Sequence, residues 1–536
     1  MVKKEREMTF DFLEYEEASK RLTLTEKIGQ SFMPAAYIND TEEEIAKLEQ
    51  SITENGVGGL CFFHSRASAA TNFEGPREVI YNEKSLEVLK KLIARYQNAA
   101  KYPLLISIDA EWGLAMRIEN TPQYPYALSL GAMQNQDDLV FQVARRIGID
   151  CREAGIHWNF APVVDINNDP QNPVIGYRSF GEDPAQVVRY GTAFFRGLNS
   201  VGILASAKHF PGHGDTSTDS HLGLPLIDKS REDLYANELK PFIELIRNGV
   251  DSVMVGHLAV PELSGGRPEA STTSKAIVDG FLRQELGFDA VVVSDALNMH
   301  AVSKNCKFKG ELEWLAYSAG IDVLCYTQNV EAGIKTIQKE GSEKLIEKHF
   351  KRVWELKKRT LSTYPKEDMK STTSRENLMI RLAEESLSLV CGDENYLTKF
   401  KASSFKGIAI GDNNEMDFFK YIDEIHPFNW SDCSGLEDKT GPEKILMALY
   451  PPSMKPVHNF GLSKETLDKI DHLSRQKEVI LYVFGNPYVL YLLPLGKFKA
   501  VWAVFQDFPE FQTNAARHFL GQSPSRGVLP VTIEAR

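Results

Sequence analysis

Apolar residues in the first two thirds of the chain form short runs that alternate with amphipathic segments. Each run is rich in β-branched residues and stops at a polar or charged residue, which is typical of buried parallel strands. The expected strands cover residues 31–35, 56–63, 104–109, 157–165, 202–208, 252–257, 290–295 and 321–326. Apolar residues at helical spacing predict helices at residues 85–97, 137–154, 184–198, 231–247 and 274–286. Eight strands alternating with helices over about 350 residues predict an α/β fold of the (β/α)8 TIM-like barrel type.

This pattern stops at residues 362–374, which are polar and contain Pro365. We expect a linker there, between a barrel domain at residues 1–361 and a second domain at residues 375–536. In the second domain we expect a helix at residues 375–385, followed by strands at 387–390, 407–410, 444–449, 479–484, 500–505 and 528–533. The alternation of strands and helices predicts a layered α/β domain with a mostly parallel sheet.

Composition and charge narrow the class of protein. The 536 residues are 43% hydrophobic and 25% charged, which predicts a folded globular chain. The net charge of −12 disfavours nucleic acid or anionic membrane as a partner. No signal peptide or membrane-spanning run is recognisable, so we expect a cytoplasmic protein. The sequence contains no phosphate-binding glycine loop, predicts no cofactor, and gives no indication of the oligomeric state.

Ionisable residues follow several of the expected strands: Asp109, Asp165, Lys208 with His209, His257 and Asp295. In a barrel these strand ends share one face, and that face carries the active site. Any one of these residues alone has a structural alternative, such as a turn cap or a hydrogen-bonded rim residue. Their joint occurrence at strand ends favours a catalytic role.

Asp295 follows the apolar residues 291–293 and Ser294. A carboxylate held at the end of a buried strand can attack an anomeric carbon and form a glycosyl-enzyme that water later opens with retention. We therefore expect Asp295 to be a nucleophile. The structural alternative is a helix N-cap for the segment that begins at Ala296.

Residues 207–221 contain three histidines, two aspartates and a lysine. A retaining glycosidase needs a proton donor, and His221 with Asp219 two residues before it fits that role. The carboxylate would stabilise the imidazolium and orient the ring. The glycine and hydroxyl residues of this loop suggest a segment that can move over a bound sugar.

Metal binding is the competing interpretation of the same loop. It would use His209, His213, Asp215, Asp219 and His221. The spacing of His209 and His213 suits a metal only on a helix, however, and Pro211 with Gly212 disfavours a helix. We therefore expect no metal, and we expect His213 to shape the loop by hydrogen bonding.

The loop motif KHFPGHGDT at residues 208–216, with DSH at 219–221, resembles the signature of the glycoside hydrolase family 3 β-N-acetylglucosaminidases. Further matches to this family are LTEKIGQ at 24–30, IDAE at 108–111, RSFGEDP at 178–184 and VSDALNM at 293–299. The resemblance covers the whole expected barrel. It implies Asp295 as nucleophile and Asp219 with His221 as the acid/base dyad.

The resemblance also implies which residues hold the non-reducing sugar: Asp109, Arg117, Arg178, Lys208 and His209. The chain departs from the family where Trp112 stands in a position that often holds glycine, which would add an aromatic wall near the sugar. The second domain, ending in SPSRGVLPVTI at 523–533, resembles the α/β sandwich of many family members. In the β-glucosidase branch that domain supplies a catalytic acid, which the dyad makes unnecessary here, so we expect it to be structural or to shape the aglycone side.

The resemblance implies a retaining β-N-acetylglucosaminidase that acts on small GlcNAc-containing carbohydrates, with peptidoglycan fragments as the expected natural substrate. We infer exo-action from Asp109 and the Arg/Lys cluster, which would hold one terminal sugar. Phosphorolysis is an alternative within the family, because a histidine acid does not repel an incoming phosphate as a carboxylate would. A non-catalytic muropeptide-binding sensor is a more remote alternative. The joint presence of Asp295, Asp219 and His221 argues against a sensor.

Overall fold

A computed structural model describes residues 12–63, 81–216, 223–304, 306–362, 373–411, 416–432 and 443–533. Contacts divide the chain into two compact units. The first comprises Met1–Tyr124, Phe141–Asp165 and Gly191–Ser371. The second comprises Pro125–Val140, Ile166–Tyr190 and Thr372–Arg536. Within the described ranges, no helix is long and apolar enough to cross a membrane.

The first unit is built on a curled parallel sheet. Its seven strands pair in the order β2-β3-β4-β5-β6-β7-β8. They are β2 (Ala35–Tyr37), β3 (Gly59–Phe63), β4 (Leu105–Ile108), β5 (Trp158–Asn159), β6 (Leu204–Phe210), β7 (Ser252–Val255) and β8 (Val291–Ser294). A separate parallel pair joins β1 (Phe32–Met33) to β9 (Leu324–Cys325). Strands appear at all eight expected places, but β5 and β9 have only two residues each, against the expected 157–165 and 321–326.

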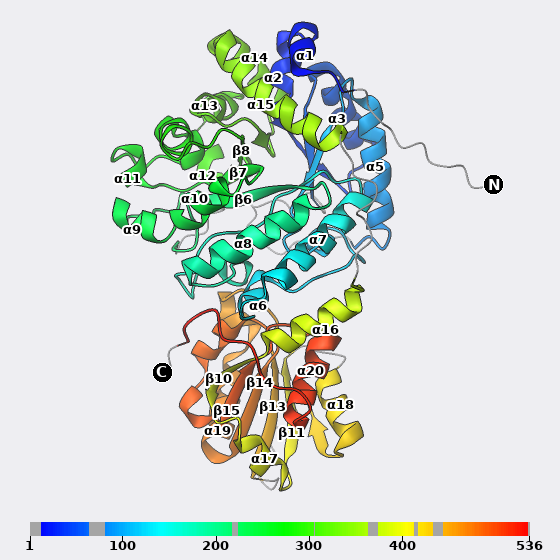
Figure 1. Ribbon diagram of the computed structural model, residues 1–536, viewed down its shortest axis with the longest axis vertical. Coiled ribbons are helices and arrows are strands. Elements are labelled where there is room, and N and C mark those ends of the chain that lie inside the picture. The colour runs from blue at the N-terminus through cyan, green and yellow to red at the C-terminus, as the bar shows by residue number, and fades with distance from the viewer. Residues whose placement is uncertain are drawn as a thin grey trace, which may run out of the picture. The chain divides into compact units, whose positions relative to one another are not determined.

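Helices follow most of these strands along the chain, and Figure 1 shows α10 beside β6 and β7. The helices before α10 are α1 (Tyr15–Arg21), α2 (Leu24–Gly29), α3 (Glu42–Asn55), α5 (Ser85–Ala99), α7 (Asp137–Glu153), α8 (Pro184–Asn199) and α9 (Arg231–Ala236). Those from α10 onward are α10 (Leu239–Arg247), α11 (Pro261–Ser264), the π-helix η4 (Ala276–Glu285), α12 (His300–Ser303), α13 (Glu311–Ala319), α14 (Val330–Glu340) and α15 (Glu343–Ser362). The helix expected at 231–247 is two helices, because the chain leaves helical geometry at Asn237.

Local sequence explains where the early helices begin and end. Thr23 and Thr41 each accept a hydrogen bond from the amide three residues later, and Glu26 and Glu44 reach back to complete capping boxes. Helix α3 ends at Gly56, whose φ of 62° is left-handed and favours glycine.

Side chains from the curled sheet fill its interior. The cluster includes Met33, Leu105, Trp158, Leu204 and Val293, each at most 4% exposed. The interior is therefore a packed core, and chemistry is confined to the strand ends and the loops beyond them.

The second unit contains a six-stranded sheet in the order β10-β15-β14-β13-β11-β12. Its strands are β10 (Ser388–Gly392), β11 (Lys406–Gly411), β12 (Asn429–Ser431), β13 (Lys444–Tyr450), β14 (Glu478–Val483) and β15 (Ala500–Ala503). All neighbours are parallel except β10, which is antiparallel to β15. The sheet is therefore mostly parallel, as expected.

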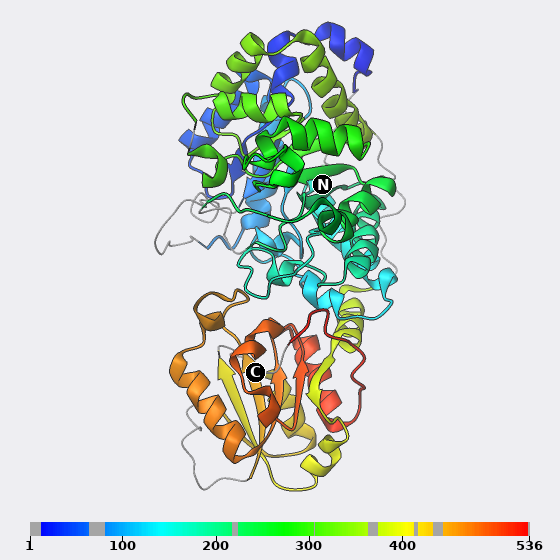
Figure 2. The same cartoon turned by 90° about the vertical axis from the view of Figure 1, so that its left-hand side faces the viewer.

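Helices lie on both faces of this sheet, with α18 and α20 on one side and α19 on the other (Figures 1 and 2). The helices of the unit are α6 (Ala127–Gly131), α16 (Arg375–Ser386), α17 (Tyr396–Lys401), α18 (Asp417–Ile425), α19 (Lys464–Gln476) and α20 (Pro509–Leu520). Leu128 and Ala132, from the segment around α6, belong to the same apolar core as β11, β13 and β14.

One expected strand of this unit was wrong, and one strand was missed. Residues 528–533 form no strand; this segment hydrogen-bonds instead through Val528 N to Ala132 O and Thr532 N to Glu182 Oε2. The sixth strand is β12, which the apolar pattern did not indicate. The expected linker at 362–374 falls almost entirely outside the described residues, so the domain boundaries stay predictions.

Candidate active site

The expected site residues of the first unit lie at the same ends of its strands. Asp109 directly follows β4, Lys208 and His209 lie near the end of β6, and Asp295 directly follows β8. Lys208 is 2% exposed and His209 is 5% exposed. Parallel pairing carries all these groups to one face of the curled sheet, as the sequence predicted.

Asp109 is held between two cations. Its Oδ1 lies 2.8 Å from Lys208 Nζ, and its Oδ2 lies 2.8 Å from an Arg117 guanidinium nitrogen. Burial would raise the pKa of Asp109, but the charges of Lys208 and Arg117 outweigh burial and hold that pKa well below its ordinary value. Asp109 is therefore an anion that can accept hydrogen bonds from hydroxyl groups.

Glu111 belongs to the same cluster, and the sequence analysis missed it. Its Oε1 lies 2.7 Å from Lys208 Nζ, so one ammonium group bridges two carboxylates. The available signal was its place two residues after Asp109, within the family motif.

Asp165, at the end of the segment after β5, is completely buried. It accepts hydrogen bonds from the backbone N–H of His209 at 3.1 Å and of His213 at 2.7 Å, and its Oδ2 lies 2.7 Å from Nδ1 of His209. Burial would raise the pKa of Asp165, but His209 and His213 lower it overall. The carboxylate thus fixes both the ring of His209 and the backbone of the turn that follows.

Asp295 is anchored through its own backbone. Its N–H donates to Val255 O at 2.9 Å, and its Oδ1 accepts from the N–H of Ala296 at 2.7 Å. Burial would raise the pKa of Asp295, but the charges of His209, His257 and Lys208 and the Ala296 N–H lower it overall. The carboxylate is therefore ionised and rigidly placed, as a nucleophile requires.

The capping alternative for Asp295 was wrong. The next helix, α12, begins at His300 with Met299 at its N-cap. Asp295 accepts instead from the N–H of the residue beside it.

His257, after β7, is completely buried, and both of its ring nitrogens are in contact with oxygen atoms. Nε2 lies 2.9 Å from Ala296 O, and Nδ1 lies 2.7 Å from Thr272 Oγ1. A carbonyl oxygen can only accept, so Nε2 carries a proton. His257 holds the segment that carries Asp295.

His213 is 1% exposed, and its Nδ1 lies 2.6 Å from Thr216 Oγ1. Burial lowers its pKa to about 4, so the ring is neutral near pH 7. The Thr216 hydroxyl also lies 3.0 Å from the His213 carbonyl, and these two bonds close the turn. Hydrogen bonding by His213 within the loop, which the sequence suggested, is what the structure shows.

Nothing in the described residues assembles a metal site: no group of three His, Cys, Asp or Glu side chains is arranged to hold an ion. Asp215 lies 2.5 Å from Lys229 Nζ in an ion pair. Asp219 and His221 lie within residues 217–222, outside the described residues, so their acid/base roles stay predictions.

Arg178 ends the short helix η2 (Gly176–Arg178), and one of its guanidinium nitrogens donates to Val174 O at 3.1 Å. This helix groups with the second compact unit. Its expected contact with the sugar stays a prediction.

Comparison with known proteins decides the family. Residues 23–356 match the glycosyl hydrolase family 3 N-terminal domain. The chain belongs to this family. It is a glycoside hydrolase, and the resemblance to the family 3 β-N-acetylglucosaminidases is confirmed.

Several relatives show how far the similarity extends. The chain is 35% identical over 271 residues to "Beta-hexosaminidase A" of Pseudoalteromonas piscicida, covering 48% of this chain and 44% of that protein. It is 34% identical over 272 residues to "Beta-hexosaminidase LpqI" of Mycobacterium tuberculosis, covering 49% and 69%. A solved family 3 β-N-acetylglucosaminidase from Paenibacillus sp. str. FPU-7 matches 96% of this chain and 100% of its own, with a TM-score of 0.77 and 28% identity.

The family 3 motif around Asp109 keeps one of its two glycines. Gly113 has a φ of 102°, and a Cβ there would lie 2.6 Å from Pro122 O, so only glycine fits. The O of Trp112 accepts a hydrogen bond from Tyr124 N at 2.9 Å. Arg117 still reaches Asp109, so Trp112 does not prevent this contact.

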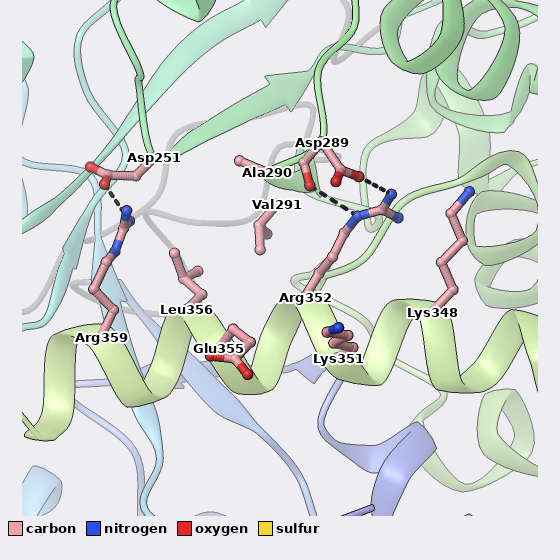
Figure 3. Close-up of a pocket in the computed structure, with 10 residues that line it drawn as sticks. All are labelled: Asp251, Asp289, Ala290, Val291, Lys348, Lys351, Arg352, Glu355, Leu356 and Arg359. Atoms are coloured by element: carbon pink, nitrogen blue, oxygen red, sulfur yellow. Dashed lines mark hydrogen bonds and ion pairs between the residues drawn. The ribbon is translucent and has the colours of Figure 1, made fainter. Parts of the chain in front are cut away.

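A hollow of about 590 Å³ lies at the opposite ends of the strands, before β7 and β8 and along α15 (Figure 3). Two ion pairs join its charged side chains: Arg352 lies 2.6 Å from Asp289, and Arg359 pairs with Asp251. These pairs link α15 to the strand beginnings. In barrel-type enzymes this face serves stability, whereas active sites lie at the other ends of the strands.

Proposed function

We propose that this family 3 protein is a retaining exo-β-N-acetylglucosaminidase. The observation that carries the proposal is the placement of Asp295: a half-buried carboxylate directly after β8, whose pKa is lowered overall by His209, His257 and Lys208 in spite of desolvation. The names of the β-hexosaminidase relatives support the choice of an N-acetylhexosamine as the sugar.

In the first step Asp295 attacks the anomeric carbon, while His221, oriented by Asp219, donates a proton to the departing oxygen. The bond to the leaving group breaks and a glycosyl ester forms on Asp295. In the second step His221 removes a proton from water, which opens the ester and restores the original anomeric configuration. Asp219 and His221 enter this mechanism from the sequence motif.

Asp109, Arg117, Lys208, His209 and Arg178 are proposed to hold the terminal sugar. The support for this is the compact charged cluster of Lys208, Asp109 and Arg117, in which the carboxylate accepts from hydroxyl groups and the cations donate. A cluster that grips one sugar favours exo-action. Peptidoglycan fragments ending in non-reducing GlcNAc are the proposed natural substrates.

We also propose the finer fold. Parallel bonds from Val293 to Val323, and from β9 to β1, support closure of the curled sheet into a (β/α)8 barrel. Helices on both faces of the six-stranded sheet support an α/β sandwich in the second domain. The cytoplasmic location and the lack of nucleic-acid or membrane partners remain predictions from composition.

Product analysis tests the function. The protein is incubated with 4-nitrophenyl β-GlcNAc with and without inorganic phosphate, and the sugar product is identified. Free GlcNAc at a rate independent of phosphate is expected. GlcNAc-1-phosphate would establish phosphorolysis instead, and calorimetric binding of a muropeptide without turnover of any aryl β-GlcNAc would favour the sensor.

A further inference from the structure

Asp165 accepts hydrogen bonds from several donors, through both of its carboxylate oxygens. Its two carboxylate oxygens accept from the backbone N–H of His209, from the backbone N–H of His213 and from Nδ1 of His209. These donors come from the end of β6, which contains His209, and from the turn after it, which contains His213. The carboxylate is 0% exposed.

The charge of Asp165 determines the direction of these bonds. Its pKa lies below the ordinary value in spite of burial, so the group is an anion near pH 7. An ionised carboxylate can only accept hydrogen bonds. Nδ1 of His209 therefore carries a proton, and Nε2, on the far side of the ring, is directed away from Asp165.

The ring so fixed belongs to the site. Burial raises the pKa of Asp295, and His209 is the first of the neighbouring groups that lower it. Gly256 N donates to Phe210 O at 2.9 Å and joins the strand end after His209 to the end of β7. A small rotation of this ring would therefore change the electrostatic environment of Asp295 and the hydrogen-bonding groups presented to the bound sugar.

We propose that Asp165 is a positioning residue for the reaction, which acts through His209 by fixing the protonated Nδ1 and presenting Nε2 to the bound sugar. This proposal rests on the proposed glycosidase function for its kinetic consequence. The orientation and the protonated Nδ1 of His209 do not depend on that function.

The protein contains a matched control. Asp322, also 0% exposed, lies 2.7 Å from Nδ1 of His349, the same separation as in the Asp165–His209 pair. Asp322 precedes β9, at the opposite ends of the strands, and is also paired with Arg283. Asp322→Asn therefore removes a comparable buried carboxylate–histidine contact away from the chemistry.

The test is a double-mutant cycle on kcat/KM for 4-nitrophenyl β-GlcNAc. Asp165→Asn is expected to lower kcat/KM by about 10²-fold, the scale of a misplaced binding group. In the His209→Ala background the same change should cost less than about 3-fold more, because asparagine keeps an oxygen that can accept from the backbone N–H groups of His209 and His213, and the remaining effect passes through the ring. Asp322→Asn should cost the same small factor in both backgrounds.

If Asp165→Asn lowers kcat/KM by the same factor in the wild-type and His209→Ala backgrounds, the proposal is overturned. Asp165 would then only stabilise the fold. The wild-type protein provides a second test that needs no variant. With nitrogen-15 in the histidine rings, the His209 signals should show a protonated Nδ1, and an unprotonated Nδ1 would overturn the proposal. If the wild type does not cleave the aryl substrate, the proposed function fails, while the ring signals still decide the role of Asp165.

Discussion

Lys208 Nζ lies 2.8 Å from Asp109 Oδ1, and the lysine side chain is 2% exposed. A buried ion pair of this kind depends on both partners, because removal of one leaves an uncompensated charge. If Asp109 holds the sugar as proposed, removal of Lys208 should make that binding depend on the protonation state of Asp109.

Lys208→Met should move the acidic limb of the kcat/KM profile to higher pH. Burial raises the pKa of Asp109 and Lys208 is the first of the charges that lower it, so without Lys208 the carboxyl group binds a proton at higher pH. The activity ratio between pH 5 and pH 7 should fall relative to wild type. Lys348→Met, on a side chain that is 50% exposed, is the control. A uniform loss at every pH would mean that Lys208 acts only by contact with the sugar.

Asp295→Ala should abolish turnover and leave the fold intact. It removes the nucleophile, for which a loss of at least about 10³-fold in kcat is expected. The matched control is Asp289→Ala, near the other end of the same strand, where the side chain is 91% exposed. Turnover and thermal unfolding are measured for both. An Asp295→Ala variant with a tenth or more of the wild-type rate would contradict the assignment.

His221→Ala should damage hydrolysis of a natural disaccharide far more than the first step on an aryl glycoside with a dinitrophenolate leaving group. A good leaving group needs little protonation, whereas a sugar needs it fully. Because His221 is also the base in the second step, the aryl substrate should show a burst followed by slow turnover. Asp219→Asn should show a milder form of the same pattern. Equal losses on both substrates, without a burst, would restrict His221 to a structural role.

Lys357→Met should stabilise the protein, and more at pH 7 than at pH 10. Burial lowers the pKa of Lys357 to about 7, and Nζ donates to Gln30 Oε1 at 2.5 Å. Between about pH 7 and 10.4 the unfolded chain keeps a proton that the folded chain has released, so a rise in pH favours the wild-type fold. The difference should be on the order of a few kcal/mol at pH 7 and shrink as the pH rises.

Urea unfolding at pH 7, 8.5 and 10 measures this difference. Lys358→Met is the control, because that side chain is 28% exposed and pairs with Glu14. A constant difference between Lys357→Met and wild type across this range would show that Lys357 does not titrate there.

The sequence predicted the strands of the first unit well because parallel strands are buried on both faces and read as continuous apolar runs. The prediction of strands failed where a strand is polar, or where an apolar run contains a residue that cannot form the hydrogen bonds of a sheet. Strand β12 contains Asn429 and Ser431 and lies at the sheet edge, so it carries no apolar run. The run at 528–533 is β-branched, but Pro530 cannot donate a ladder hydrogen bond.

The sequence could predict a site residue where its charged side chain comes directly from the end of an apolar strand. Asp109, Lys208 and Asp295 follow apolar runs directly, and the structure places them at the expected strand ends. The bonds from Asp165 to the turn at His209 and His213, and the bridge from Lys208 to Glu111, join different loops. Such contacts depend on tertiary structure, which hydrophobic periodicity does not encode.

The placement of Leu128 and Ala132 in the core of the second unit has a consequence for any shortened gene. A chain ending at residue 361 would keep these two residues but lose the strands β11, β13 and β14 that share their core. The exposed remnant would invite self-association. Truncation at residue 361 therefore leaves an exposed apolar surface. A first domain expressed alone would need polar substitutions at Leu128 and Ala132.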